Sequence, residues 1–193
     1  MDLKFQCKCG QVTGTLKNLK PSGVNRVVCY CRFCQAYEQH LSGAKQKDQP
    51  GSDLFQMSPR DIQFEQGFEW VHAIKLTDKG PLRYYAKCCN TPLVNGLQNM
   101  KVPFTGVAID CVPQLLEESQ SLLSIGPIRA RVNTHGAQQK ALPKSDNASK
   151  YRMFAHLARL MFGWWLRGDA KRSPFINAQG QPVLVGERIR LEP

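Results

Sequence analysis

Hydrophobic and polar positions alternate along the first part of the chain, which is the pattern of short β-strands with one buried face. The alternation covers residues 3–9, is interrupted at Gly10 and resumes over residues 12–16. Further short apolar runs predict strands, and these cover residues 24–30, 54–57, 70–76, 82–86, 107–109 and 127–132. The segment 77–81, Thr-Asp-Lys-Gly-Pro, is a turn signal, so the strands beside it should form a hairpin.

Helical spacing appears in three places. A short helix is expected to open at Cys34 and to end near Gly43, a second covers residues 115–123, and the clearest covers residues 151–167. In this last helix, Phe154 and Trp164 belong to one apolar face, which we expect to pack back on the protein. The pattern predicts a mainly β protein with a C-terminal helix.

Composition divides the chain into a β domain and an extension. Residues 135–149 are polar and contain Gly136 and Pro143, as a linker does. We therefore expect a β domain at 1–134, a linker at 135–149 and a C-terminal extension at 150–193 that carries an amphipathic basic helix.

The net charge of +11, from 26 Lys and Arg against 15 Asp and Glu, favours an anionic partner without choosing its class. An acidic small molecule, nucleic acid and an anionic membrane surface all fit, and so does a basic surface that is simply solvated. No apolar run is long enough to span a bilayer, and the N-terminus lacks the apolar core of a signal peptide. We therefore expect a cytoplasmic protein.

Cysteine spacing is the strongest chemical signal in the chain. Five of the eight cysteines form a C-x-C at residues 7–9 and a C-x-C-x-x-C at residues 29–34, and an adjacent pair follows at residues 88–89. Without sign of export, such spacing indicates metal ligands rather than disulfides. Three thiolates leave one position of a tetrahedral zinc ion to be filled by protein or by a substrate. The isolated Cys111 is better explained as a small buried hydrophobic residue.

The order of these clusters, followed by Cys89-Asn90-Thr91-Pro92, resembles the glutathione-dependent formaldehyde-activating enzyme family, which includes centromere-protein-V-like proteins. The resemblance covers residues 3–132 and implies an Mss4-like β-sandwich of short antiparallel strands. It also implies an open zinc site at Cys29, Cys31 and Cys34, which would be the catalytic one.

The resemblance further implies a closed zinc site, for which Cys7, Cys9 and Cys89 match three ligands. The family's fourth cysteine is replaced here by Ala86. Three alternatives follow: Cys88 substitutes for it, a water or histidine completes the site, or the site is lost. Zinc is thus expected at one site or at both.

By resemblance, the chain is expected to be a zinc-dependent carbon–sulfur lyase-like protein that acts on glutathione or a related thiol adduct. Tyr30, Arg32, Gln35 and Tyr37 flank the open site in sequence and are candidates for its pocket, and His40 is expected to pack in the core or to support the site by a hydrogen bond. The alternative is a non-catalytic, zinc-stabilised module that docks an acidic partner or nucleic acid. The sequence shows no Ser-His-Asp order, phosphate-binding glycine loop or helical H-E-x-x-H.

Overall fold

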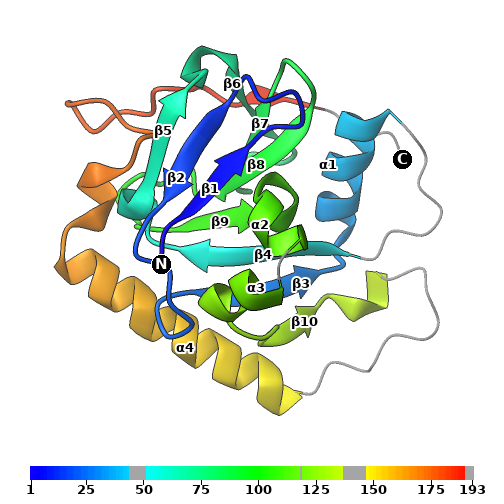
Figure 1. Ribbon diagram of the computed structural model, residues 1–193, viewed down its shortest axis with the longest axis vertical. Coiled ribbons are helices and arrows are strands. Elements are labelled where there is room, and N and C mark those ends of the chain that lie inside the picture. The colour runs from blue at the N-terminus through cyan, green and yellow to red at the C-terminus, as the bar shows by residue number, and fades with distance from the viewer. Residues whose placement is uncertain (44–50, 118, 137–146, 190–193) are drawn as a thin grey trace.

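The computed structural model describes residues 1–43, 51–117, 119–136 and 147–189, and this part of the chain is mainly β (Figure 1). Its strands form a small sheet and a large one. The small sheet has the order β1 (Leu3–Gln6), β2 (Thr13–Leu16) and β5 (Ile62–Gln66), with antiparallel neighbours.

The large sheet contains eight strands within the described residues. In spatial order these are β10 (Ala130–Val132), β3 (Asn25–Cys29), β4 (Ser52–Met57), β9 (Thr105–Ala108), β8 (Thr91–Gly96), β7 (Leu82–Ala86), β6 (Val71–Lys75) and β11 (Glu187–Arg188). The inner pairs are antiparallel, whereas β10 and β11 each join an edge in parallel. Both ends of the sheet are thus extended by segments from late in the chain.

Helices lie around the sheets (Figure 1). The α-helices are α1 (Arg32–Ser42), α2 (Pro113–Glu117), α3 (Ser119–Ile125) and α4 (Asn147–Leu166). Short 3-10 turns are η1 (Pro59–Asp61), η2 (Phe68–Trp70), η3 (Ile109–Cys111), η4 (Thr134–Gly136) and η5 (Asp169–Arg172). The main core joins the two sheets, and its largest fully buried side chains include Phe5, Phe55 and Tyr84.

Most of the expected strands are present, and β6 and β7 form the predicted hairpin. The apolar pattern did not predict β5 or β8, whereas the helix expected at 115–123 lies within residues that are helical where the structure describes them, namely 113–117 and 119–125. The predicted inward face of α4 is partly wrong: Trp164 is buried, but Phe154 is 58% exposed and Met153 is buried instead. Helix α4 lies against β3, β10 and η5, so tertiary contacts select which apolar stripe is covered.

The segment after α4 contacts the β part of the structure at two points. Phe175 stacks on Tyr84 at 4.2 Å between ring centroids and is 2% exposed. The fully buried carboxylate of Asp169 accepts hydrogen bonds from Ser58 Oγ at 2.9 Å and Arg167 Nη2 at 2.7 Å. Residues 137–146, which make up most of the predicted linker, lie outside the described residues. The proposed division into domains therefore stays a prediction.

We predict that Phe175→Ala lowers the free energy of unfolding by about 3–5 kcal/mol, because it removes a fully buried ring from the core. Urea denaturation measures this change. The matched control is Phe162→Ala, at a position on α4 that is 61% exposed, where a change within about 0.5 kcal/mol is expected. Equal effects of the two substitutions would contradict the docking of the C-terminal segment.

Candidate metal centres

The fold gathers seven of the eight cysteines into two groups. One contains Cys7, Cys9, Cys88 and Cys89, and the other contains Cys29, Cys31 and Cys34. Within each group the sulfur atoms lie within 4.8 Å of one another, and all eight cysteines are free thiols. Each group can therefore hold a metal ion.

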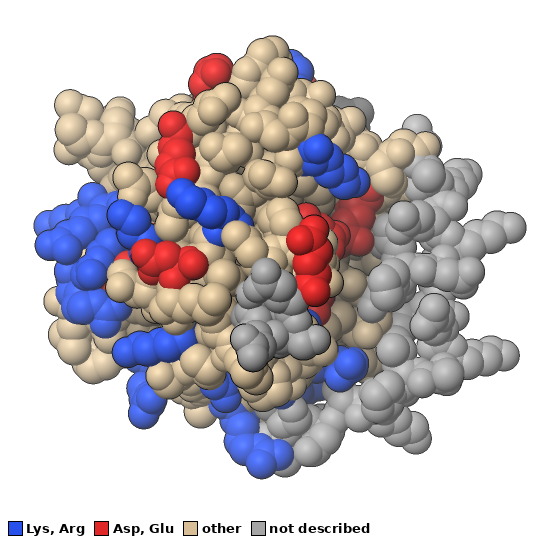
Figure 2. Space-filling model, in the orientation of Figure 1, with Lys and Arg blue, Asp and Glu red and all other residues tan. Residues whose placement is uncertain are grey.

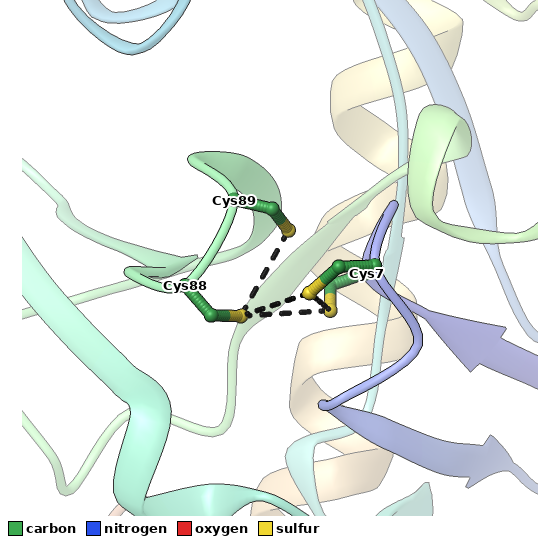
Figure 3. Close-up of side chains that lie close together, drawn as sticks. Cys7, Cys88 and Cys89 are labelled. Carbon is green, nitrogen blue, oxygen red and sulfur yellow. Dashed lines mark hydrogen bonds between the residues drawn. The ribbon is translucent and has the colours of Figure 1, made fainter.

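Two tight turns build the four-cysteine group. Cys7 and Cys9 lie just after β1, where Gly10 has a φ of +76° and donates its N–H to the Cys7 carbonyl at 2.9 Å. Cys88 and Cys89 lie between β7 and β8, where Asn90 has a φ of +53°. Asparagine tolerates this left-handed conformation. Figure 3 shows the two turns facing each other across the sulfur atoms.

Sulfur separations in this group suit a single tetrahedral ion. Zn–S bonds of about 2.3 Å place the sulfurs of a tetrahedral site about 3.8 Å apart. Cys88 Sγ lies 3.8 Å from Cys7 Sγ, 3.3 Å from Cys9 Sγ and 3.9 Å from Cys89 Sγ, and Cys7 Sγ lies 3.5 Å from Cys9 Sγ. These distances are far too long for S–S bonds. The group presents four thiols to one point.

Cys88 therefore supplies the fourth sulfur of this group, the ligand position for which the family resemblance gave no match. Ala86 is fully buried in the core, while both members of the adjacent pair Cys88 and Cys89 face the other turn (Figure 3). Thr91, also fully buried, supports this arrangement because its Oγ1 lies 3.0 Å from Cys89 Sγ and accepts the Lys8 N–H at 2.9 Å. Of the three alternatives left open by the sequence, the geometry favours substitution by Cys88.

The three-cysteine group is built by the junction of β3 and α1. Cys29 ends the strand, Cys31 is the N-cap of the helix and Cys34 lies in its first turn. Cys31 Sγ accepts the Cys34 N–H at 3.4 Å, and Asn133 Nδ2 donates to Cys29 Sγ at 3.5 Å. Hydrogen bonds and a helix N-terminus both favour the thiolate form. Among the described residues, no histidine or carboxylate completes the group.

The charged side chain of Arg83 lies close to Cys34 of this group. It is 4% exposed, and its Nη1 and Nη2 atoms lie 3.8 and 3.7 Å from Cys34 Sγ. Its guanidinium also lies over the Tyr37 ring, 5.2 Å from the centroid. No acidic side chain in the described part of the chain forms an ion pair with Arg83. A buried cation of this kind needs a negative neighbour, and a thiolate supplies one.

Crowding distributes protons unequally among the three thiols. Hydrogen bonds from the Cys29 and Cys34 thiols lower the pKa of Cys31 to about 2. Hydrogen bonds with Cys29 and Cys31 raise the pKa of Cys34 well above its ordinary value, and burial adds to this effect. The lowered pKa favours the thiolate form of Cys31, which is the form that ligates metals.

The three sulfurs open into an apolar pocket of about 380 Å³. Helix α1 and strands β3, β4, β7, β8 and β9 all contribute to its lining. The four-cysteine group does not line this pocket, although Cys89 lines the rim of a larger polar cleft of about 810 Å³. The four-cysteine group thus presents four sulfurs to one point, whereas the three-cysteine group presents three sulfurs beside an apolar pocket.

Several side chains lie elsewhere than the sequence suggested. Tyr30 and Tyr37 line the larger cleft rather than the apolar pocket. Arg32 is exposed over the Phe33 ring. The expectation of core packing for His40 is wrong: it is exposed, because Cys34, Tyr37 and Leu41 define the buried face of α1.

Two further assignments concern Gln35 and Cys111. Gln35 donates to the Tyr30 carbonyl at 3.1 Å. Cys111 is fully buried and donates to the Ala108 carbonyl at 3.1 Å, which fits its expected place in the core. Sequence reasoning missed Arg83, whose only signal was an arginine inside an otherwise apolar strand.

Comparison with family models gives a match over residues 2–187. The chain belongs to DUF6151, a family of unknown function. No curated protein matches it. A solved Rhodobacter sphaeroides protein is similar at 16% identity and a TM-score of 0.43, over 60% of this chain and 96% of that one, a likeness too low to support an argument. For this DUF6151 protein, function must be argued from the cysteine groups themselves.

We predict that Cys88→Ala and Cys89→Ala each remove about one equivalent of bound metal from the DUF6151 protein. Loss of a metal that binds only the folded state should also lower the unfolding free energy by about 3 kcal/mol at saturating metal. Elemental analysis and thermal melting measure the two effects. Cys111→Ala is the control and should leave the metal content unchanged. If Cys88→Ala behaves like Cys111→Ala, Cys88 is not a ligand.

We predict that Arg83→Met weakens metal binding at the three-cysteine group by about 10–100-fold, the usual cost of removing a side chain that supports a ligand. Arg83→Lys retains the positive charge and should lose less. Competition with a coloured chelator measures both affinities, and the four-cysteine group of the same molecules serves as the internal reference. Equal affinities in the two variants would show that the charge beside Cys34 is unimportant.

Proposed function

We propose that the protein binds zinc at both cysteine groups, with a structural ion at Cys7, Cys9, Cys88 and Cys89 and a reactive one at Cys29, Cys31 and Cys34. The observation that carries this proposal is the contrast between the groups: one offers four converging sulfurs, and the other offers three beside a pocket. A closed set of four ligands is typical of structural zinc, and three protein ligands with an open position are typical of catalytic zinc.

The donors fit zinc better than other metals. Thiolates are soft ligands that select zinc, copper(I) or iron–sulfur clusters, and a tetrahedral arrangement of sulfur is typical of zinc. Magnesium and calcium prefer oxygen, which neither group supplies. When bound, zinc would lower the pKa of a thiol at the open position and keep it as a thiolate.

The reaction that we propose is the formation or cleavage of a carbon–sulfur bond between a small thiol and a carbonyl compound. In the forward direction, the sulfur lone pair attacks the carbonyl carbon, the C=O π pair moves to oxygen, and the proton that the thiol has lost ends on that oxygen. The reverse direction returns thiol and carbonyl compound, so no oxidant or further reactant is needed. Arg83 keeps a positive charge beside Cys34, and the pocket walls beside the reacting sulfur are mostly apolar.

The resemblance to glutathione-dependent formaldehyde-activating enzymes supports this proposal through the placement of its motifs. The mainly β architecture accommodates the proposed Mss4-like fold, and the C-x-C-x-x-C forms a group of three sulfurs at a pocket. By this resemblance we propose a carbon–sulfur lyase-like activity. In that family the thiol is glutathione, and for this chain we propose glutathione or a related small thiol.

A second function, the docking of an acidic partner or nucleic acid, is favoured by the surface around the end of α4. Lys and Arg side chains gather on this side of the molecule (Figure 2). Arg167, Lys171 and Arg172 are exposed there, close in sequence to the exposed ring of Trp165. Exposed aromatic and basic side chains together suit single-stranded nucleic acid. No helix of the described residues is long and apolar enough to cross a membrane.

We predict that the purified protein contains about two equivalents of zinc, one at each group, and that Cys31→Ser loses one of them while the other remains. The retained ion shows that the variant is folded. Wild-type protein should also bind a small thiol, with a change in the metal spectrum after cobalt substitution, and Cys31→Ser should not. A protein that keeps all its zinc in Cys31→Ser would refute the three-cysteine site. Zinc binding without any thiol response, together with salt-sensitive binding of an oligonucleotide, would favour docking instead.

A further inference from the structure

We propose that the ligand of the three-cysteine site is an apolar thiol rather than glutathione, an inference that rests on the proposed thiol-binding function. This inference rests on the position of three converging sulfurs beside a largely hydrophobic pocket. The proposal names the substrate class: a small thiol whose carbon skeleton is hydrophobic and which carries no carboxylate.

Hydrophobic side chains dominate the walls that a ligand at this site would meet. The lining includes Phe33 in the first turn of α1, Leu54 on β4, Val27 on β3 and Phe104 in the loop before β9. Asn95 and Gln56 supply neutral polar groups. At about 380 Å³, the pocket is near the lower end of ligand sites, which span about 300–1,000 Å³.

Charge is scarce in this pocket. Among the described residues that line it, Arg83 alone is charged, and its guanidinium is already directed at Cys34 Sγ. Glutathione carries carboxylates and an ammonium group, and each would need a charged or multiply hydrogen-bonded partner when buried. A hydrophobic thiol places no such demand, and its burial is favourable.

The larger polar cleft is an alternative binding place for glutathione, and the experiment must distinguish it from the apolar pocket. Arg83, Leu54 and Asn95 line both spaces, so they adjoin at these residues. In the cleft, basic side chains such as Lys8 and Arg131 lie among the carboxylates of Glu38, Asp53 and Asp110. Asp53 is paired with Arg26 at 2.7 Å. This mixture of charges would repel the glutathione carboxylates as well as attract them, so it does not favour that ligand.

Thiol binding to the cobalt-loaded full-length protein tests the proposal directly. Phenylmethanethiol, 3-mercaptopropionate and glutathione are each titrated, and the change in the cobalt–thiolate absorption gives an affinity. The four-cysteine group contributes a constant background, and Cys31→Ser identifies the response of the other site. We expect phenylmethanethiol to bind about tenfold or more tightly than glutathione, a ratio of the size that hydrophobic pockets achieve.

A single substitution should invert the preference. Phe104→Lys puts a positive charge on the half-buried pocket wall, so it should weaken phenylmethanethiol and strengthen 3-mercaptopropionate. Phe162→Lys makes the same chemical change on the exposed part of α4 and should leave both affinities unchanged.

The outcomes distinguish this inference from the function on which it rests. If no thiol alters the cobalt spectrum, the proposed function fails. If thiols do alter it but glutathione binds as tightly as phenylmethanethiol or more tightly, the site is a thiol site and the apolar preference is wrong. Equal effects of Phe104→Lys and Phe162→Lys would also overturn the assignment of this pocket.

Discussion

The approach of the β7–β8 turn to the turn after β1 is the constraint on which the rest of the structure depends. It joins the small sheet, through Cys7 and Cys9, to the large sheet, through Cys88 and Cys89. The hydrogen bond from Lys8 to Thr91 couples the same two turns through the backbone. A metal at this point would bind the folded chain only, since the sulfurs come from sequence positions some eighty residues apart.

Strand β7 connects this junction to the second cysteine group. Its alternation places Tyr84 in the main core and directs Arg83, on the opposite face, towards Cys34. Tyr37 of α1 donates a hydrogen bond to the Tyr84 carbonyl at 3.1 Å and lies beneath the Arg83 guanidinium. The helix that presents Cys34 is thus positioned by the strand that leads to Cys88. A shift of β7 would disturb both groups.

The sequence predicted the chemistry better than it predicted the surroundings. Cysteine spacing identified the three-cysteine group because C-x-C-x-x-C acts locally, through turns whose geometry short sequences determine. The resemblance, not the spacing, placed Cys7 and Cys9 together with Cys89. The sequence left the role of Cys88 open among three alternatives, because that role depends on where the turn between two strands with long-range pairings lies in the fold. Strand β8 was not predicted because Pro92 and Asn95 interrupt its alternation of apolar and polar residues. The buried face of α4 was not predicted fully because it depends on the strands against which the helix packs. Arg83 was missed because the partner of a buried charge is a tertiary contact, which no local pattern reveals.

Exposure explains why the two groups differ in their need for an arginine. With zinc bound as proposed, four thiolates leave an excess negative charge at the first group, but Cys9 is exposed, so water can solvate it. The second group is more deeply buried, since both Cys29 and Cys34 are buried. Three thiolates on zinc there would leave one uncompensated negative charge in a poorly solvated place, and Arg83 neutralises it. A fourth thiolate then restores a single negative charge rather than doubling it. In the proposed zinc site, the arginine would thus make the open position accessible to an anionic sulfur ligand, and the apolar walls would select what that sulfur is attached to.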